Sequence, residues 1–480
     1  MRGRDALATA GEDAGATLGG DCSSCAFLIH KWVEISRIYQ TAMARAGGAP
    51  ALACSRKPHR NREMNERMSK RLWLLGLGLL VSIGVLMACG SKYNSSSNGL
   101  LLVGSQGSGL IQTFSFSLNN GHISAIANPT SDTANQSCVL KGQPASMVID
   151  PAGAFAYAII LGSACTAPGD TIAAFKINSD GTTTPAGTPV AVPTPIALAM
   201  DSAGKFLFVA EGSGLEVYAI GSGASLAKVS GTFTAQPTAL APNFVALAAT
   251  PTVFPGIGVN GVQNAACSAG SNPPTSEFLY AVDSKNYAVW EFSVDTNTGA
   301  LGNPPGLTAV ALFGTDQVPA GIAVDPCDRF VYVSDSLTNK VSAYLICTKV
   351  ISPTPCPNAD GSLHEVENSP YSLTGNANGP GPIAVDPYGN NVYVVGTLSN
   401  TVSGFKISPA TGGLTAMTPA VVATGLEPRS IAIRGDDNWM FIANHNGATV
   451  SQYSIVPATG ALTAEAPIQT DNYPWGVAVK

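Results

Sequence analysis

Short apolar runs alternate along most of the chain with turns rich in Gly, Pro, Asp and Asn, the pattern typical of β-strands joined by tight turns. One phrase recurs: an apolar run ends in Asp, a turn with Pro or Gly follows, and a run containing Tyr or Phe comes next. Its copies are Met147–Tyr157, Leu198–Phe208, Ile322–Tyr332, Ile383–Tyr393 and, more weakly, Ile431–Phe441. Each copy predicts an antiparallel hairpin whose Asp caps the turn. Turn capping, rather than metal binding, is therefore the expected role of Asp150, Asp201, Asp325 and Asp386.

A second phrase follows each first one: a turn residue, then Gly, then an apolar residue. Its glycines number seven, namely Gly121, Gly181, Gly223, Gly299, Gly361, Gly412 and Gly460. Two hairpins in each repeat make a four-stranded meander, and such a meander at this period is typical of a propeller blade. We therefore predict an all-β fold, a seven-bladed β-propeller over residues 100–480. A pair of β-sandwiches and a solenoid are the alternatives.

The two ends of this region carry complementary fragments of a repeat. The chain stops after Pro474–Lys480, which matches only the first strand of a repeat. The propeller region begins at Leu100 with three segments that match strands two to four of a repeat. One C-terminal strand and three N-terminal strands would therefore close the ring as the seventh blade, and a solenoid does not need such an arrangement.

Composition supports this prediction and limits the function. Only 12% of residues are charged, and the chain holds 51 Gly and 33 Pro. These values are unlike those of disordered chains and coiled coils. The net charge is +5 over residues 1–88 and −11 over the remainder. Because the body is acidic, no nucleic-acid partner is expected.

The charge changes sign at a segment with the three parts of an export signal. The basic stretch Met68–Arg71 precedes the uncharged, apolar residues 72–88, and Cys89 follows. Residues 86–89, Leu-Met-Ala-Cys, resemble the bacterial lipobox, which implies lipidation of Cys89. The absence of Asp after Gly90 implies sorting to the outer membrane. An uncleaved membrane helix is the alternative, because 17 apolar residues are marginal for a span.

This signal predicts the organisation and location of the chain. Residues 64–88 are a lipoprotein-type signal peptide, and residues 89–99 are a flexible tether. Residues 1–63 precede the natural start positions Met64 and Met68 and are an extension that is untranslated or disordered. The propeller is expected in the cell envelope, anchored through lipid on Cys89 and facing the periplasm or the surface. No metal site is expected, since Cys22 and Cys25 lack a well-spaced second pair of ligands.

Six cysteines follow Cys89, an even number that suits an oxidising compartment. In a propeller, the turns between strands one and two and between strands three and four share one face. The other connections share the opposite face. Cysteines that fall on a common face then pair as Cys347–Cys356, Cys267–Cys327 and Cys138–Cys165. Free buried cysteines are the alternative.

Three repeats carry a resemblance to a known family. Residues Val331–Tyr344, Val392–Phe405 and Met440–Tyr453 resemble the Tyr-Val-Thr-Asn class of surface propeller repeats and the lactonase-type seven-bladed propellers. That family includes 6-phosphogluconolactonases, which open a sugar lactone by hydrolysis. The resemblance implies polar Arg, His and Glu side chains near the channel mouth. No cofactor is expected, because the region after Cys89 shows no Walker loop, haem-type Cys-x-x-Cys-His motif or metal-spaced His pair.

Candidate site residues follow from the register of the repeats. Arg429 begins the inner strand of the sixth blade, and His445 lies in the loop between strands two and three of that blade. Both are expected to open toward the same face near the axis and are candidate catalytic residues. Glu211, Asp283 and Asp335 occupy comparable loop positions in other blades and, with Trp475, are candidate ligand-binding residues. Alternatively, His445 is a solvated loop residue, Arg429 pairs with a carboxylate, and Tyr473 and Trp475 pack the closing seam.

Three functions fit these observations. The first is a membrane-tethered, extracytoplasmic propeller that binds a small sugar, a lactone or a protein partner without catalysis. The second is a lactone hydrolase similar to the 6-phosphogluconolactonases. The third is a structural surface protein. Propeller folds host many functions, so the site must decide among them.

Overall fold

The computed structural model describes residues 98–126, 142–163, 169–212, 214–230, 242–250, 277–302, 310–311, 318–348, 356, 360–456 and 458–480. They belong to one compact unit, Ser95–Lys480. The expected extension, signal peptide and lipidated Cys89 lie outside the described residues, as does all but the end of the tether. Within the described ranges, no helix is long and apolar enough to cross a membrane.

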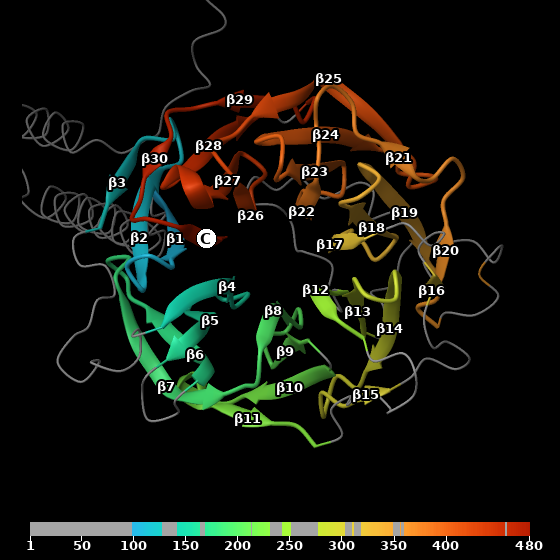
Figure 1. The fold of residues 1–480 in the computed structure, drawn as a ribbon. Coiled ribbons are helices and arrows are strands. Elements are labelled where there is room, and N and C mark those ends of the chain that lie inside the picture. Colours follow the sequence, from blue (N-terminus) through green and yellow to red (C-terminus); the bar gives the residue numbers. More distant parts are fainter. Residues whose placement is uncertain are drawn as a thin grey trace, which may run out of the picture. The chain divides into compact units, whose positions relative to one another are not determined.

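Seven β-sheets stand around a central axis as the blades of a propeller (Figure 1). We number the blades along the chain and name the strands of each from the axis outward. Blade 1 is β4 Gln143–Ile149, β5 Phe155–Ser163, β6 Gly169–Ile177 and β7 Thr183–Ala191. Blade 2 is β8 Pro195–Met200, β9 Phe206–Glu211, β10 Gly214–Ile220 and β11 Leu226–Lys228. Blade 3 is β12 Phe244–Ala249, β13 Glu277–Asp283, β14 Ala288–Val294 and β15 Leu301–Gly302, with β16 Val310–Ala311 beside β14.

The remaining four blades repeat this plan. Blade 4 is β17 Pro319–Val324, β18 Phe330–Asp335, β19 Lys340–Ile346 and β20 Leu363–Glu365, with β21 Tyr371–Ser372 beside β19. Blade 5 is β22 Pro380–Val385, β23 Asn391–Gly396, β24 Thr401–Ile407 and β25 Leu414–Ala423. Blade 6 is β26 Pro428–Ile433, β27 Trp439–Asn444, β28 Thr449–Ile455 and β29 Leu462–Ala464, with β30 Ile468–Gln469 beside β28. Blade 7 is β31 Pro474–Val479, β1 Asn98–Ser105, β2 Leu110–Ser117 and β3 Ile123–Ala125. The described helices are two short 3₁₀ turns, η1 Ser222–Ala224 and η2 His445–Gly447.

Blade 7 confirms the predicted ring closure. The C-terminal strand β31 pairs with β1, with Leu101 opposite Val479, and β1 continues into β2 and β3. Two backbone hydrogen bonds between Leu100 and Lys480, of 3.1 and 2.8 Å, complete the seam. The seven-bladed all-β fold predicted from the repeats is therefore the fold of this chain.

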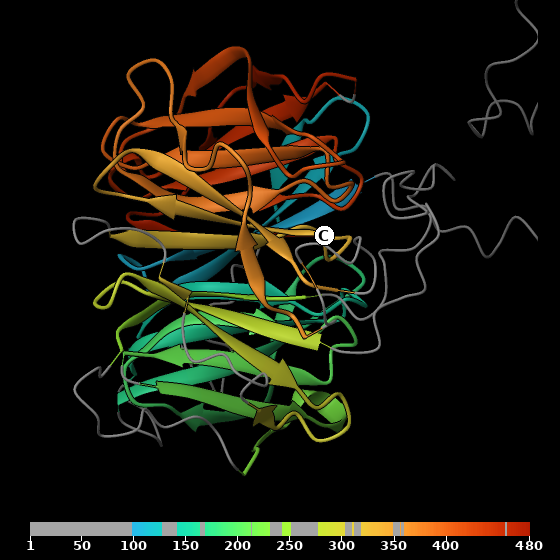
Figure 2. The same cartoon turned by 90° about the vertical axis from the view of Figure 1, so that its right-hand side faces the viewer.

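Apolar packing between neighbouring blades forms the core. Figure 2 shows the propeller from the side. The second strand of a blade is buried on both sides, and every residue of β18, β23 and β27 is buried. One cluster, for example, joins Phe330 and Tyr332 of blade 4 to Val392 and Phe405 of blade 5. This double burial explains why so few charges occur in the repeats.

The turns between strands one and two and between strands three and four lie on one side of the ring, here the turn face. All seven predicted glycines occupy the turn between strands three and four, with φ between 66° and 81°. A Cβ on Gly412 would overlap the ring of Phe330 in the preceding blade, so glycine is required there by both conformation and space. In the turn between strands one and two of blade 2, Asp201 Oδ1 accepts hydrogen bonds from the backbone amides of Lys205 and Phe206. The predicted capping role of the Asp repeat is therefore confirmed at Asp201.

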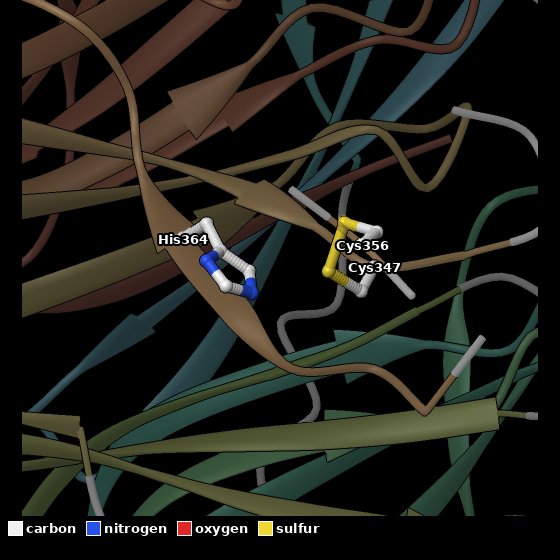
Figure 3. A group of neighbouring side chains, drawn as sticks. All are labelled: Cys347, Cys356 and His364. Atoms are coloured by element: carbon white, nitrogen blue, oxygen red, sulfur yellow. A yellow bond between two sulfur atoms is a disulfide. The ribbon is translucent and has the colours of Figure 1, made fainter. Parts of the chain in front are cut away.

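One predicted disulfide is present in the described residues. Cys347 and Cys356 are bonded across nine positions in the outer connection of blade 4. Cys327 is also disulfide-bonded, and its predicted partner Cys267 lies outside the described residues, as do Cys138 and Cys165. His364 lies beside the Cys347–Cys356 bridge (Figure 3). Because both sulfur atoms are bonded to each other, the group offers no thiolate for a metal.

Candidate functional site

The inner strands share an irregularity at the face opposite the turns, here the mouth face. In every blade, the pairing of the inner strand with its neighbour shifts register at this end. In blade 6, Pro428 lies opposite Asn444 and Ser430 lies opposite Ala443, so Arg429 is released from the ladder. Such bulges re-aim a side chain. The equivalent residues, here the mouth tier, are Ile196, Val245, Ala320, Gly381, Arg429 and Trp475.

The mouth tier lines a central cavity of about 600 Å³. All seven inner strands contribute to its wall (Figure 1). The deeper wall is aliphatic and is formed largely by Met147, Leu198, Leu247, Ile322, Ile383, Ile431 and Val477. Among the described residues that line the cavity, Arg429 carries the one charged side chain. The cavity therefore has a single polar corner, where blades 6 and 7 meet.

Four polar side chains meet at this corner. Arg429 Nη2 and Asn446 Nδ2 donate hydrogen bonds to the two carboxylate oxygens of Glu427. His445 Nδ1 lies 3.7 Å from Glu427 Oε2. Glu427 thus holds a guanidinium, an amide and an imidazole around one carboxylate. The hydrogen bond from Arg429 is the main cause that holds the pKa of Glu427 below its usual value, so this carboxylate stays ionised at neutral pH.

Aromatic rings border the same corner. The His445 ring lies 5.1 Å from the ring of Tyr473 and 5.1 Å, edge to face, from that of Trp475. The Arg429 guanidinium lies 5.2 Å from the centre of the Trp475 ring, in cation–π range. The Tyr473 side chain is about half exposed, while that of His445 is only 17% exposed. The imidazole is therefore held on three sides and reaches solvent through the mouth.

The backbone at this corner is strained. Glu427 and Tyr473 have φ of 54° and 59°, in the left-handed region, and each directly precedes the proline that begins an inner strand. Non-glycine residues in this region cost roughly 1–3 kcal/mol and gather at functional sites. The Glu427 amide donates to Asn400 Oδ1 at 2.7 Å, which fixes the loop. This geometry turns both side chains toward the mouth.

The structure brings together Arg429, His445 and Trp475 but places the other three candidates elsewhere, two of them as loop caps. Asp283 is fully buried, and its oxygens accept hydrogen bonds from Asn243, Lys285, Asn286 and Trp290. Asp335 is 2% exposed, and its Oδ1 accepts from three backbone amides around its own loop. Both residues cap loops at the mouth face and neither lines the cavity.

Glu211 also lies away from the cavity wall. Burial, followed by the neighbouring Glu216, raises the pKa of Glu211 to about 7. Glu216 itself accepts hydrogen bonds from Tyr218 and Lys228. Glu211 is therefore part of a polar cluster between strands of blade 2, and the structure does not join it to Arg429.

The sequence reasoning missed Glu427 and Asn446. A signal for Glu427 was present, because a residue before proline recurs at the start of inner strands in Thr194-Pro195, Glu427-Pro428 and Tyr473-Pro474. All three of these residues have positive φ. Asn446 had no such signal, since its position depends on the η2 turn.

Solved structures share this architecture at low sequence identity. A candidate 6-phosphogluconolactonase from Bacteroides fragilis has a TM-score of 0.60 and 20% identity, covering 81% of this chain and 99% of that one. A periplasmic gluconolactonase from Pseudomonas aeruginosa has a TM-score of 0.59 and 17% identity, covering 80% and 99%. These identities establish a common fold. No curated protein sequence matches the chain.

Family membership rests on the sequence itself. The family model for lactonases with a seven-bladed β-propeller matches residues 100–473, which is the described propeller almost from end to end. The seven-bladed fold of the described residues agrees with that match. The chain therefore belongs to the lactonase family of seven-bladed β-propellers.

Proposed function

We propose that this protein hydrolyses a lactone at the mouth of its central channel. The observation that carries the proposal is a cluster in which Arg429, the one charged side chain among the described residues of the cavity wall, pairs with Glu427, and Glu427 in turn lies 3.7 Å from His445. Family membership and the gluconolactonase neighbours support it. Ester hydrolysis needs a base for water and a donor for the oxyanion, and these side chains provide both.

The proposed step uses no group outside the chain and the substrate. His445, oriented by the Glu427 carboxylate, removes a proton from a water molecule as its oxygen attacks the lactone carbonyl carbon. Arg429 donates to the carbonyl oxygen, which becomes negative in the transition state. The ring C–O bond then breaks, and the ring oxygen takes the proton from His445. The product is a hydroxy acid, which leaves as a carboxylate.

The proposal is tested by lactone hydrolysis with the purified protein and two variants. Arg429→Ala and His445→Ala are expected to lose at least about a hundredfold in kcat. Arg434→Ala is the matched control, because Arg434 also pairs with a carboxylate, Asp436, on the turn face. Equal turnover in all four proteins would contradict the assignment of the corner as the active site.

Binding without catalysis is the second function that the site supports. Tyr473 and Trp475 offer aromatic surfaces beside Arg429, which is an arrangement that holds a small ligand. A ligand-dependent change in tryptophan fluorescence, combined with no turnover on any lactone, would favour this function over hydrolysis.

We also propose that the propeller acts outside the cytoplasm, tethered through lipid on Cys89. The basic and apolar segments before Cys89 support this location, and one structural neighbour is described as periplasmic. Cells fed a radiolabelled fatty acid are expected to label the wild-type chain. Cys89→Ser should abolish the label, while Cys54→Ser should retain it. Label that persists in Cys89→Ser would contradict the tether.

A further inference from the structure

The charge balance of the mouth limits the substrates that it can hold. Among the described residues, Arg429 is the one cationic side chain of the cavity wall, and its guanidinium already donates to Glu427. The pair carries no net charge when both groups are ionised. A phosphate dianion is normally met by several charge-assisted donors. The described wall therefore offers a phosphorylated lactone a single cation that is already paired.

The wall opposite Arg429 is apolar. Blades 2 and 3 lie across the axis from blade 6, and their mouth-tier residues are Ile196 and Val245 (Figure 1). Ile196 is 38% exposed, so its side chain faces open space although it is aliphatic. Ala320 and Gly381 continue the tier toward Arg429 without a polar side chain. A ligand held at Arg429 thus extends toward aliphatic surface.

Few neutral polar side chains supplement this wall. Ser146, Thr397 and Ser430 are the hydroxyl side chains that line it. Thr397 already donates to the Pro428 carbonyl at 3.1 Å, and Ser430 accepts from the Val477 amide at 3.2 Å. The remaining polar groups of the described wall are the indole N–H of Trp475 and the free backbone edges of the inner strands, which carry no charge. A ring with many hydroxyls would leave its water shell for few side-chain partners.

We propose, on the basis of the proposed hydrolysis, that the substrate is an uncharged lactone with an apolar substituent. The lactone carbonyl lies at Arg429 and His445, and the substituent crosses the mouth to Ile196 and Val245. Trp475 covers the ring on the side of blade 7. Phosphorylated and polyhydroxylated lactones are poorer substrates, because the first meets one cation that is already paired and the second meets few side-chain hydrogen-bond partners.

Three δ-lactones separate these classes: δ-decalactone, glucono-δ-lactone and its 6-phosphate. The full-length protein is expected to hydrolyse δ-decalactone with a kcat/KM at least about tenfold above the other two. δ-Hexalactone, which has the same ring and a shorter chain, should lose about tenfold relative to δ-decalactone. A higher kcat/KM for either gluconolactone would overturn the inference and leave the hydrolytic function intact.

A substitution across the mouth tests the charge argument in the opposite direction. Ile196→Arg places a second cation at the position in blade 2 that is equivalent to Arg429, and the exposed side chain there leaves room for it. We expect about a tenfold rise in kcat/KM for the 6-phosphate relative to Ile196→Gln, the neutral control of similar size. A 6-phosphate rate that is high in wild type and unchanged in Ile196→Arg would contradict the inference.

Binding keeps the inference testable if the hydrolytic function fails. The lactams that correspond to the three lactones are not opened, and Trp475 beside Arg429 reports their binding through fluorescence. Tighter binding of the alkyl lactam than of the two sugar lactams supports the inference whether or not turnover occurs. Tighter binding of a sugar lactam overturns it. Absence of turnover on every lactone contradicts only the hydrolytic function.

Discussion

Two arginine–carboxylate pairs in this propeller use the same chemistry in opposite surroundings. Arg329 and Asp325 lie between blades 4 and 5, with side chains that are 5% and 0% exposed. Arg429 and Glu427 lie at the mouth, with side chains that are 37% and 27% exposed. The first pair joins two blades, and the second faces the cavity. Their difference shows which features distinguish a structural ion pair from a candidate catalytic one.

The buried pair has satisfied donors. Arg329 donates to both oxygens of Asp325 at 2.8 Å, and its Nη2 also donates to the Gly389 carbonyl of the next blade at 3.0 Å. The mouth pair is less completely hydrogen-bonded. Arg429 Nε and His445 Nδ1 are buried and have no hydrogen-bond partner in the described part of the chain. The guanidinium at the mouth is therefore held mainly by one carboxylate, whereas that of Arg329 is held by a carboxylate and by the backbone of the next blade.

The largest expected effect is on the buried pair. Arg329→Met leaves Asp325 buried without its cation and should lower the free energy of unfolding by about 3–5 kcal/mol. Urea denaturation measures this loss, and Arg429→Met is the matched control, with an expected loss below about 1 kcal/mol. Similar losses in the two variants would remove the distinction between the pairs.

The loss of activity in these two variants should follow the reverse order, with the larger loss in Arg429→Met. Arg429→Met is expected to lower the kcat of lactone hydrolysis by about 10²–10³-fold, because the oxyanion loses its donor. Arg329→Met, assayed below its unfolding temperature, should retain kcat within a few-fold of wild type. Steady-state kinetics with δ-decalactone decide this, and a comparable loss of kcat in folded Arg329→Met would break the comparison.

The next largest expected effect on stability is at Glu277, a buried carboxyl group that is not paired with an arginine. Burial, followed by the nearby Asp201, raises the pKa of Glu277 to about 8, and the ion pairs of the described residues do not include it. The folded state therefore holds a proton that the unfolded state releases above about pH 4.5, and stability falls as the pH rises from about 4.5 to 8. Glu277→Gln should be more stable than wild type by on the order of 1–3 kcal/mol at pH 8. Urea denaturation should show this gain shrinking toward pH 5, and a gain independent of pH would argue against the titration.

The smallest effect belongs to the carboxylate at the mouth. The Glu427 pKa is lowered, so the stability it contributes is present at neutral pH and is lost only as the pH falls through that lowered pKa. Since the pair is partly exposed, Glu427→Gln should change the free energy of unfolding by less than about 1 kcal/mol at pH 7. Thermal unfolding tests this, and a loss as large as that of Arg329→Met would make the mouth pair structural.

The repeats made the fold predictable. At six of the seven turns, a Cβ on the left-handed glycine would overlap a side chain of the preceding blade, and at Gly223 the positive φ alone favours glycine. The seven turns therefore stay visible in the sequence. The closure was visible because its two ends are fragments of one repeat. Both features are local patterns that the fold repeats, and this is why counting them predicted seven blades.

The site was only partly predictable. Each repeat position is occupied by one residue in every blade, and the site depends on which of these equivalent residues face the axis. Arg429 and Trp475 share a position in the inner strand, and the register exposed both. Glu211, Asp283 and Asp335 also share a position, at the end of the second strand, but burial and loop capping engage two of them. Glu427 was missed because its orientation comes from a left-handed residue before proline. Nothing in the repeat pattern shows which way such a residue turns.

The entry of the chain into blade 7 has a practical consequence. β1 begins at the turn face, where Asn98 pairs with Ser117 next to the Gly121 turn, and Lys480 ends on the same face beside Gly153. A fusion protein or a solid support joined at Lys480 therefore attaches to the side away from the mouth. It holds the propeller by its turn face while the cavity stays open to arriving molecules.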